Sequence, residues 1–460
     1  MHSNTREAEF LGKESIGRIM WRLTPPVMLA QLVMGLYNIV DSAFVGQCSK
    51  EALTGLSVIF PLQLIICALA VGTGVGVNTY MARLYAEDNE KKARQVGGIG
   101  ILLAVITWVI FALISAAIMR PYAMTGARSQ EAIDAAVIYG NIVCVGSLGT
   151  FLESMFSKIH QSKGNMRLPV IAQIVGAAVN ILLDPILIFG FAFIPGMGVA
   201  GAAIATVIGQ FTAALITVFG AVSAPPPLRE AVGQIKTVYL LGYPSILMQA
   251  LYTVYIVFLN AILATFSDAA VTVLGLYYKL QMFFFMPING LQICIVPVIS
   301  YNFTQKAYKR CEKVMNYSFA ICLIFMLIGF VCFVFFPHEV LSLFSSDPSV
   351  HEIGDVAFRL IGCGFFSACF SLMLPVFFQA IGSGIPSVML SLCRQILCLP
   401  VLFYLFSLIG LDYTWIAFPA SETISGAVGL LLYILTLRRW RRLAQSAPSI
   451  PPSPQKEECP

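Results

Sequence analysis

Apolar residues run along this chain in long stretches separated by short polar segments. Most stretches reach about 20 residues, the length that an α-helix needs to cross a membrane. Several exceed about 25 residues, which predicts tilted or kinked helices. The pattern predicts twelve membrane spans: Met20–Val45, Gly55–Leu84, Val96–Met119, Asp134–His160, Leu168–Phe191, Gly198–Ser223, Ile235–Phe266, Val273–Asn302, Lys313–Phe336, His351–Ile381, Pro386–Leu408 and Tyr413–Leu437.

A proline-rich segment, Ser223–Arg229, separates the first six predicted spans from the last six. Three consecutive prolines make this connection stiff. We therefore predict an all-α polytopic membrane protein built from two lobes of six helices. Its predicted parts are a cytoplasmic N-terminal segment at 1–19, an N-lobe at 20–223, a cytoplasmic linker at 224–234, a C-lobe at 235–437 and a cytoplasmic tail, first basic and then disordered, at 438–460.

The two sets of spans also resemble each other at a single offset of 218 residues. Because each copy contains six spans, both copies enter the membrane from the same side. The repeat therefore predicts a pseudo-two-fold axis along the membrane normal, as in two-lobed transporters. The matching pairs are Pro26 and Pro244, Gln31 and Gln249, Tyr37 and Tyr255, Gln161 and Gln379, and Gly164 and Gly382.

Composition and charge support a membrane protein. Hydrophobic residues make up 58% of the chain and charged residues 11%, whereas soluble proteins carry about 25% charged residues. With the N-terminus placed in the cytoplasm, the inner segments carry more Lys and Arg than the outer ones by about five to one. Both termini are therefore expected in the cytoplasm. The net charge is +5, and the basic residues are distributed over the cytoplasmic segments instead of forming one patch that could bind nucleic acid.

The sequence shows no catalytic or metal-binding motif. The twelve Cys include no CxxC pair, and the patterns GxSxG, HExxH and Walker A are absent. The four histidines, His2, His160, His338 and His351, have no metal-ligand spacing. We therefore expect neither an enzyme, nor a resident metal, nor a cofactor.

The predicted spans contain four acidic residues that we take as candidates for function: Asp41, Glu153, Asp184 and Glu422. Charges inside a membrane are costly and mark functional sites. Helical spacing puts Tyr37 and Asn38 on one face with Asp41, and it puts Asn180 one turn before Asp184. Pro185 also disturbs the backbone hydrogen bonds there. Two such carboxylates can hold a proton, or Na⁺ together with Asn, Thr and carbonyl oxygens; alternatively, each acid only hydrogen-bonds a neighbouring helix.

The repeat assigns this polar set to one lobe. At the same offset, Asp41, Asn180, Asp184 and Thr206 correspond to Leu259, Cys398, Leu402 and Ile424. We interpret this asymmetry as one ion-handling lobe and one neutral lobe.

The other ionisable residues inside the spans have simpler interpretations. Glu153 lies near Lys158, which favours a structural role. Glu422 has no evident basic partner, while Lys279 and Arg394 are expected to extend toward the interface or to pair with loop carboxylates.

Aromatic residues and Met gather in the C-lobe and provide candidates for a substrate cavity. Such surfaces accept flat lipophilic cations through dispersion and cation–π contacts. Ordinary helix packing is the alternative for each side chain. The candidates are Tyr255, Gln249, Met282, Phe283 and Met286.

The chain also contains four longer motifs. They are Pro26…Gln31…Leu36-Tyr37-Asn38-Ile39-Val40-Asp41…Phe44-Val45-Gly46, Asn180…Asp184-Pro185, Gly198-Val-Ala-Gly201…Thr206 and Gln379-Ala-Ile-Gly382. Together they resemble the multidrug and toxic compound extrusion (MATE) family, DinF-like branch, and the resemblance extends from Ser15 to about Arg442.

The resemblance implies a V-shaped transporter that exports drugs against inward H⁺ or Na⁺. It implies that Asp41, Asn180, Asp184 and Thr206 bind the proton or cation. Tyr37, Asn38, Tyr139 and Gln31 would support this network, and Pro26 would be the hinge of the first helix. The NorM-like acids of the seventh and tenth helices have no counterpart in the core of those spans, which favours H⁺.

We therefore predict a monomeric multidrug antiporter of the bacterial inner membrane. Its expected partners are small-molecule drugs, organic cations and membrane lipid, with H⁺ or Na⁺ as coupling ion. The alternatives are a Na⁺-only exporter, a flippase for lipid-linked precursors and a receptor or scaffold without transport. A flippase would need a basic cavity or additional spans.

Overall fold

The computed structural model describes residues 10–48, 50–126, 129–191, 195–342 and 348–446. This part of the chain is helical, which confirms the predicted all-α class. Within it, nine helices are long and apolar enough to cross a membrane, and a tenth crossing results if one bent helix pair forms a single span. The other two predicted spans correspond to α2 (Ile16–Cys48) and α9 (Leu228–Leu263), which are 33 and 36 residues long.

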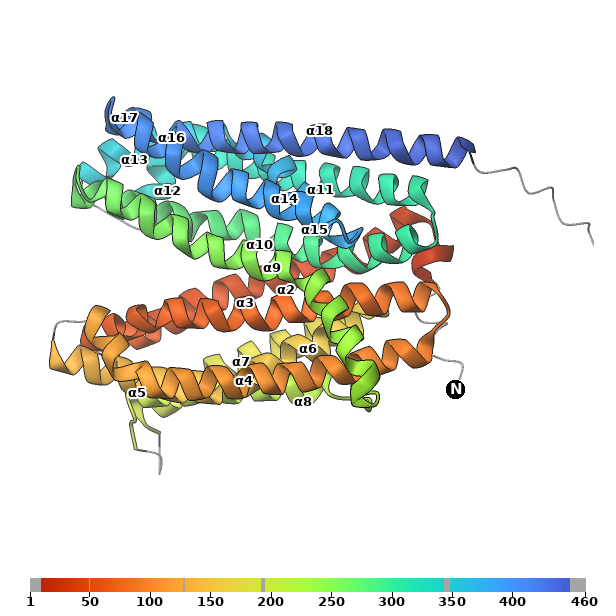
Figure 1. The fold of residues 1–460 in the computed structure, drawn as a ribbon. Helices are drawn as coiled ribbons and strands as arrows, with labels where there is room; N and C mark the ends of the chain where they lie inside the picture. Colours follow the sequence, from red (N-terminus) through yellow and green to blue (C-terminus); the bar gives the residue numbers. More distant parts are fainter. Residues whose placement is uncertain (1–9, 49, 127–128, 192–194, 343–347, 447–460) are drawn as a thin grey trace, which may run out of the picture.

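The helices form two groups that run roughly parallel to one another (Figure 1). The first group is the N-lobe, and the second is the C-lobe. Besides α2, the N-lobe contains α3 (Lys50–Ala86), α4 (Glu90–Gly126), α5 (Gln130–Gly146), α6 (Leu148–Ser162), α7 (Arg167–Phe189) and α8 (Val199–Thr217). Besides α9, the C-lobe contains α10 (Asp268–Thr304), α11 (Tyr308–Phe335), α12 (Pro337–Ser342), α13 (Pro348–Gly362), α14 (Phe365–Ala380), α15 (Gly384–Leu392), η1 (Cys393–Cys398), α16 (Leu399–Ser407), α17 (Leu411–Thr414) and α18 (Ala417–Ser446).

The fourth and tenth predicted spans, which are equivalent in the two repeats, are both interrupted within the span. The fourth span breaks at Ser147 between α5 and α6. The tenth breaks between α13 and α14, which are bent by 56°. The eleventh span is continuous but contains the π-helix η1, and Pro400, which lacks an amide donor, follows directly after it.

The repeat is visible in the backbone. Gly164 and Gly382 both adopt positive φ, at 79° and 75°. The amide of Gly164 bonds the carbonyl of Gln161, and the amide of Gly382 bonds that of Gln379. Asp88 and Lys306, which are also 218 residues apart, share the φ value of 55° that non-glycine residues rarely adopt. The two halves of the chain therefore build the same turns at matching positions.

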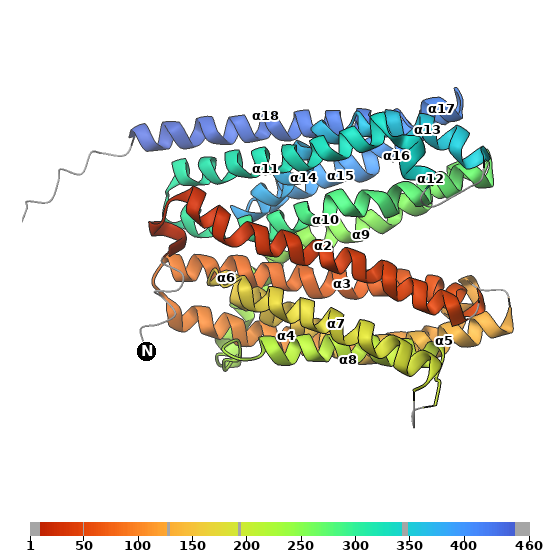
Figure 2. The ribbon, with the colours of Figure 1, turned by 180° about the vertical axis from the view of Figure 1, so that it is seen from behind.

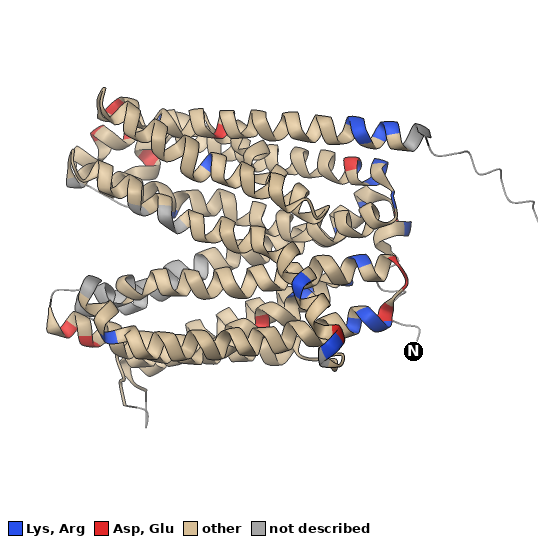
Figure 3. Cartoon of the chain, viewed as in Figure 1, with Lys and Arg blue, Asp and Glu red and all other residues tan. Residues whose placement is uncertain are grey.

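The lobes meet along α2 and α3 on one side and α9 and α10 on the other (Figure 2). α3 approaches α9 closely, since a Cβ at Gly242 would lie 2.5 Å from the Gly72 carbonyl oxygen. Gln305 donates a hydrogen bond to the Ala86 carbonyl, and Arg310 Nη2 donates to the Glu14 carbonyl at 2.8 Å. These contacts lie toward the end of the molecule where the Lys and Arg residues of α18 and α11 gather (Figure 3).

Several element boundaries differ from the predicted ones, and three of these differences change the predicted linker and tail. α8 ends at Thr217, before the predicted end at Ser223. α9 begins at Leu228, so the second half of the predicted linker is helical. α18 continues to Ser446, beyond the predicted end at Leu437, because its basic last turns extend the same helix out of the apolar segment.

Candidate functional site

In the N-lobe, the structure brings three of the four predicted cation-site residues onto two adjacent helices. α7 carries Asn180 and Asp184, which are 2% and 0% exposed, and α8 carries Thr206. The Asn180 Nδ2 donates a hydrogen bond to Thr206 Oγ1 at 3.4 Å. The Thr206 hydroxyl in turn donates to the Ala202 carbonyl at 3.0 Å.

Small residues allow this contact between α7 and α8. A Cβ at Gly176 would lie 2.7 Å from the Gly209 carbonyl oxygen, and one at Gly209 would lie 3.0 Å from Asn180 Cβ. One turn further along α7, Pro185 lacks the amide hydrogen that would bond the Ile181 carbonyl. The site therefore combines a buried carboxylate, an amide, a hydroxyl and a backbone carbonyl. These are oxygen donors that suit a proton or a hard cation.

The fourth residue, Asp41, lies on α2, which packs against α7. The side chains of Asp41, Tyr37 and Asn38 are outside the described residues. Gln31 and Pro26 are half-buried on the same helix, which contains both Pro25 and Pro26.

Tyr139 of α5 is buried, and its hydroxyl accepts a hydrogen bond from Gln63 Nε2 of α3 at 3.3 Å.

Glu153 of α6 accepts hydrogen bonds from neutral donors and lies near the buried Lys158. Its Oε1 accepts a hydrogen bond from Ser157 at 2.7 Å and a longer one from Gln173 of α7 at 3.4 Å. Lys158 is buried, and its ammonium donates to Gln161 Oε1 at 3.0 Å. Glu153 therefore links α6 to α7 through neutral hydrogen-bond donors.

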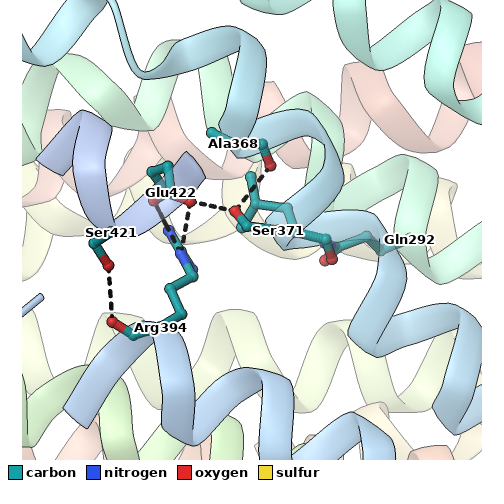
Figure 4. Close-up of polar contacts among 7 residues, drawn as sticks. Gln292, Ala368, Ser371, Arg394, Ser421 and Glu422 are labelled. Atoms are coloured by element: carbon teal, nitrogen blue, oxygen red, sulfur yellow. Dashed lines mark hydrogen bonds and ion pairs between the residues drawn. The ribbon is translucent and has the colours of Figure 1, made fainter. Parts of the chain in front are cut away.

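The C-lobe contains buried charged residues, which corrects its interpretation from the sequence as a neutral lobe. Arg394 and Glu422 form an ion pair inside the last two spans, with Arg394 Nη2 and Nε at 2.7 Å and 2.9 Å from Glu422 Oε1 (Figure 4). Their side chains are only 16% and 14% exposed. Ser371 of α14 donates to the same carboxylate, and Ser421 donates to the Arg394 carbonyl at 3.1 Å. The expectations that Glu422 lacks a basic partner and that Arg394 extends toward the interface or a loop were wrong.

The sequence contains a signal for this pair. Arg394 and Glu422 have opposite charges and lie at comparable depth on either side of the connection at Gly410. Arg394 lies in the π-helix η1, so this span departs from regular α-helical spacing at the ion pair.

The candidate substrate residues of the C-lobe differ in burial. Tyr255 is buried in a cluster with Tyr252 and Tyr278, at ring distances of 5.5 Å and 6.4 Å, and it interacts electrostatically with the Arg394–Glu422 pair. The remaining candidates are half-buried on α9 and α10: Gln249, Met282, Phe283 and Met286. Of these, Met286 lies at the lobe boundary, since a Cβ at Gly35 of α2 would lie 3.3 Å from Met286 Cγ.

One family model matches this chain twice, once in each lobe. The MatE family model matches residues 26–186 and again residues 244–405. The two matches begin 218 residues apart, which is the offset found in the sequence.

Curated relatives are similar over nearly the full length. The FAD transporter of Shewanella oneidensis is 24% identical over 432 residues, which cover 92% of this chain and 95% of the relative. The multidrug export protein MepA of Staphylococcus haemolyticus is 24% identical over 435 residues, covering 92% and 94%.

Solved structures share the fold. An outward-facing multidrug resistance MATE transporter of the MOP superfamily has a TM-score of 0.87 and 24% identity, covering 95% of this chain and 99% of that one. A MOP superfamily transporter from Pyrococcus furiosus has a TM-score of 0.87 and 23% identity, covering 94% and 98%. MATE structures have twelve helices in this arrangement, which confirms the predicted architecture. This chain belongs to the MatE family, whose members are membrane transporters and not enzymes.

Proposed function

We propose that this protein is a secondary active antiporter of the bacterial inner membrane that exports amphipathic, mostly cationic small molecules in exchange for inward H⁺. Family membership and the export proteins among its relatives support the transport of small molecules. The coupling to H⁺ is inferred from the chemistry of the N-lobe.

The observation that carries this proposal is the buried polar set of α7 and α8. Asp184 is fully buried within a helix that is long and apolar enough to cross a membrane, one turn from the Asn180–Thr206 hydrogen bond. A carboxyl group in such a place is expensive to keep charged and is retained for function. The equivalent C-lobe positions are apolar or a thiol, so this set is not a structural requirement of the repeat.

Protonation would act through the helices that meet at this site. α2 carries Asp41 and contains Pro25 and Pro26, and it packs against α7 on one side and α10 of the other lobe on the other side. A change of charge on Asp41 or Asp184 would alter the packing of α2 and shift the balance between the two orientations of the lobes. With the Lys- and Arg-rich end in the cytoplasm, the contacts described above close the cytoplasmic side of the molecule.

A second candidate is the export of a flavin nucleotide. It is favoured by the Shewanella oneidensis relative, which is an FAD transporter. The half-buried Tyr252 and Tyr278, which pack against the buried Tyr255, offer aromatic surface for a flat ring system in either case.

The test is gradient-driven transport in proteoliposomes. A fluorescent organic cation and FAD would be supplied separately, first under an imposed pH gradient and then under a Na⁺ gradient. Asp41→Asn and Asp184→Asn would be compared with Leu402→Met, a conservative change at the C-lobe position equivalent to Asp184.

We expect movement of the organic cation under the pH gradient alone, reduced to background in both Asn variants and retained in Leu402→Met. Movement that requires Na⁺ would overturn the assignment of the coupling ion. Movement of FAD but not of the cation would show that the substrate is a flavin nucleotide and not an organic cation. Transport at the parental level in Asp184→Asn would remove Asp184 from the mechanism.

A further inference from the structure

The fold brings together two histidines and one aspartate that are separated in the sequence. His338 is the second residue of α12, and His351 and Asp355 lie one turn apart on α13. The nitrogen and oxygen atoms that these three side chains can offer to a metal all lie within 4.8 Å of one another. His338 Nδ1 is 3.4 Å from Asp355 Oδ2, and the two imidazole rings are 4.5 Å apart. Sequence spacing alone shows no such cluster.

Packing beneath the cluster holds the two helices in register. Leu341 of α12 is fully buried and lies against Gly354 of α13, where an added Cβ would be 2.6 Å from Leu341 Cδ1. This contact lies between the positions of His351 and Asp355 along α13 and one turn after His338 on α12. The donor atoms are therefore positioned by the core of the lobe and not by their own contacts alone.

The separation of the donor atoms suits one metal ion. Ligands at about 2.1 Å from a tetrahedral metal lie about 3.4 Å from each other. The His338–Asp355 distance already has this value, and small side-chain rotations would bring His351 into range. Two imidazoles and one carboxylate favour Zn²⁺ and other late first-row divalent ions over Mg²⁺ and Ca²⁺, which prefer oxygen ligands. Three protein ligands leave a position for water.

The cluster is accessible to ions in solution. The side chains of His338 and Asp355 are 64% and 33% exposed. α12 and α13 lie at the end of the C-lobe opposite to the basic end of α18 (Figure 1). Glu339 and Glu352 follow the two histidines directly, and Arg359 lies one turn beyond Asp355; all three are exposed, so solvent screens their charges.

We propose that His338, His351 and Asp355 form a binding site for one Zn²⁺ ion, or a chemically similar divalent ion, that joins α12 to α13. Bound metal would stiffen the outer half of the bent tenth span, because α13 continues into α14 after the 56° bend. The site does not depend on the proposed transport reaction and is tested without it.

The experiment uses the full-length protein in detergent, purified without a polyhistidine tag and stripped of metal. Zn²⁺ binding would be measured by calorimetry, and Co²⁺ binding by its visible absorption, which reports coordination geometry. We expect one equivalent to bind. His351→Ala and His338→Ala should each lower the affinity at least 10–100-fold. Glu352→Gln, an exposed neighbour outside the cluster, should bind as the parent does.

Thermal unfolding provides a second measurement. Zn²⁺ should raise the apparent Tm of the parent and of Glu352→Gln but not of the two His variants, whose Tm without metal should equal that of the parent. Absence of stoichiometric binding, or binding unchanged in both His variants, would overturn the proposal. The His338–Asp355 contact would then be an ion pair only.

Discussion

Each lobe places one glutamate between equivalent helices, but the two lobes surround it differently. In the N-lobe, Glu153 of α6 accepts hydrogen bonds from the neutral donors Ser157 and Gln173. The residue 218 positions after Glu153 is Ser371 of α14, and Ser371 donates a hydrogen bond to Glu422. The carboxylate of Glu422 thus lies at the place that the repeat assigns to Glu153, although it comes from the twelfth span.

The repeat also relates the residues that surround the two glutamates, and these residues differ between the lobes. Arg394 is the equivalent of Gly176, which lies one turn along α7 from Gln173. In the C-lobe that position supplies a charge-balancing guanidinium, whereas in the N-lobe the glycine allows α7 and α8 to pack closely. Pseudo-symmetry therefore preserves where a carboxylate lies and leaves the chemistry around it free to diverge.

The largest effect is expected from removing one member of the C-lobe pair. Glu422→Leu leaves the Arg394 guanidinium buried without its counter-charge, which costs about 3–5 kcal/mol of stability. The free energy of unfolding can be measured by SDS titration in mixed micelles. A loss below about 1 kcal/mol would show that the pair is solvated.

Removing both charges should recover much of this loss. In the double variant Arg394→Met/Glu422→Leu no buried charge remains, and such replacements are often close to neutral. We expect the double variant to exceed the Glu422→Leu single variant by at least about 2 kcal/mol in the same titration. Additive losses would instead mean that each residue has separate partners.

A smaller effect is expected at the N-lobe polar set. Thr206→Val preserves the shape but removes the hydroxyl that accepts from Asn180, so the buried Asn180 amide loses this partner at a cost of about 1–3 kcal/mol. Ile424→Val at the equivalent C-lobe position is the control and should cost no more than about 1.5 kcal/mol as a methylene deletion. Dye transport by Thr206→Val at the parental rate would argue against a role of this hydroxyl in coupling.

The smallest change is expected from Glu153→Gln. Glutamine retains an oxygen that accepts from Ser157, and its environment supplies neutral donors, so stability should change by less than about 1 kcal/mol. Glu422→Gln is the matched variant, since it leaves the charge of Arg394 unbalanced and should be clearly less stable. Equal stability of the two Gln variants would contradict the distinction between a charge-paired Glu422 and a Glu153 that accepts from neutral donors.

Part of the site could be predicted from the sequence, and the rest could not. Helical spacing placed Asn180 and Asp184 on one face of α7, and the resemblance grouped them with Thr206; in the structure, Asn180 donates a hydrogen bond to Thr206. The Arg394–Glu422 pair was missed because it joins two different spans, whose relative rotation helical spacing within one span does not give. The cluster of His338, His351 and Asp355 was missed because packing between α12 and α13, at Leu341 and Gly354, brings its members together.

The sequence by itself determined the membrane spans, their number, the repeat and the sorting of charge between the two ends. These properties depend on apolar length and on local composition, because a span must satisfy its own backbone hydrogen bonds and cover itself with apolar side chains. Only the tertiary structure decided which buried charges meet and where the lobes touch. Those contacts depend on the rotation, bending and close approach of whole helices, and small residues such as Gly72, Gly176 and Gly242 set these at a distance from the groups that they bring together.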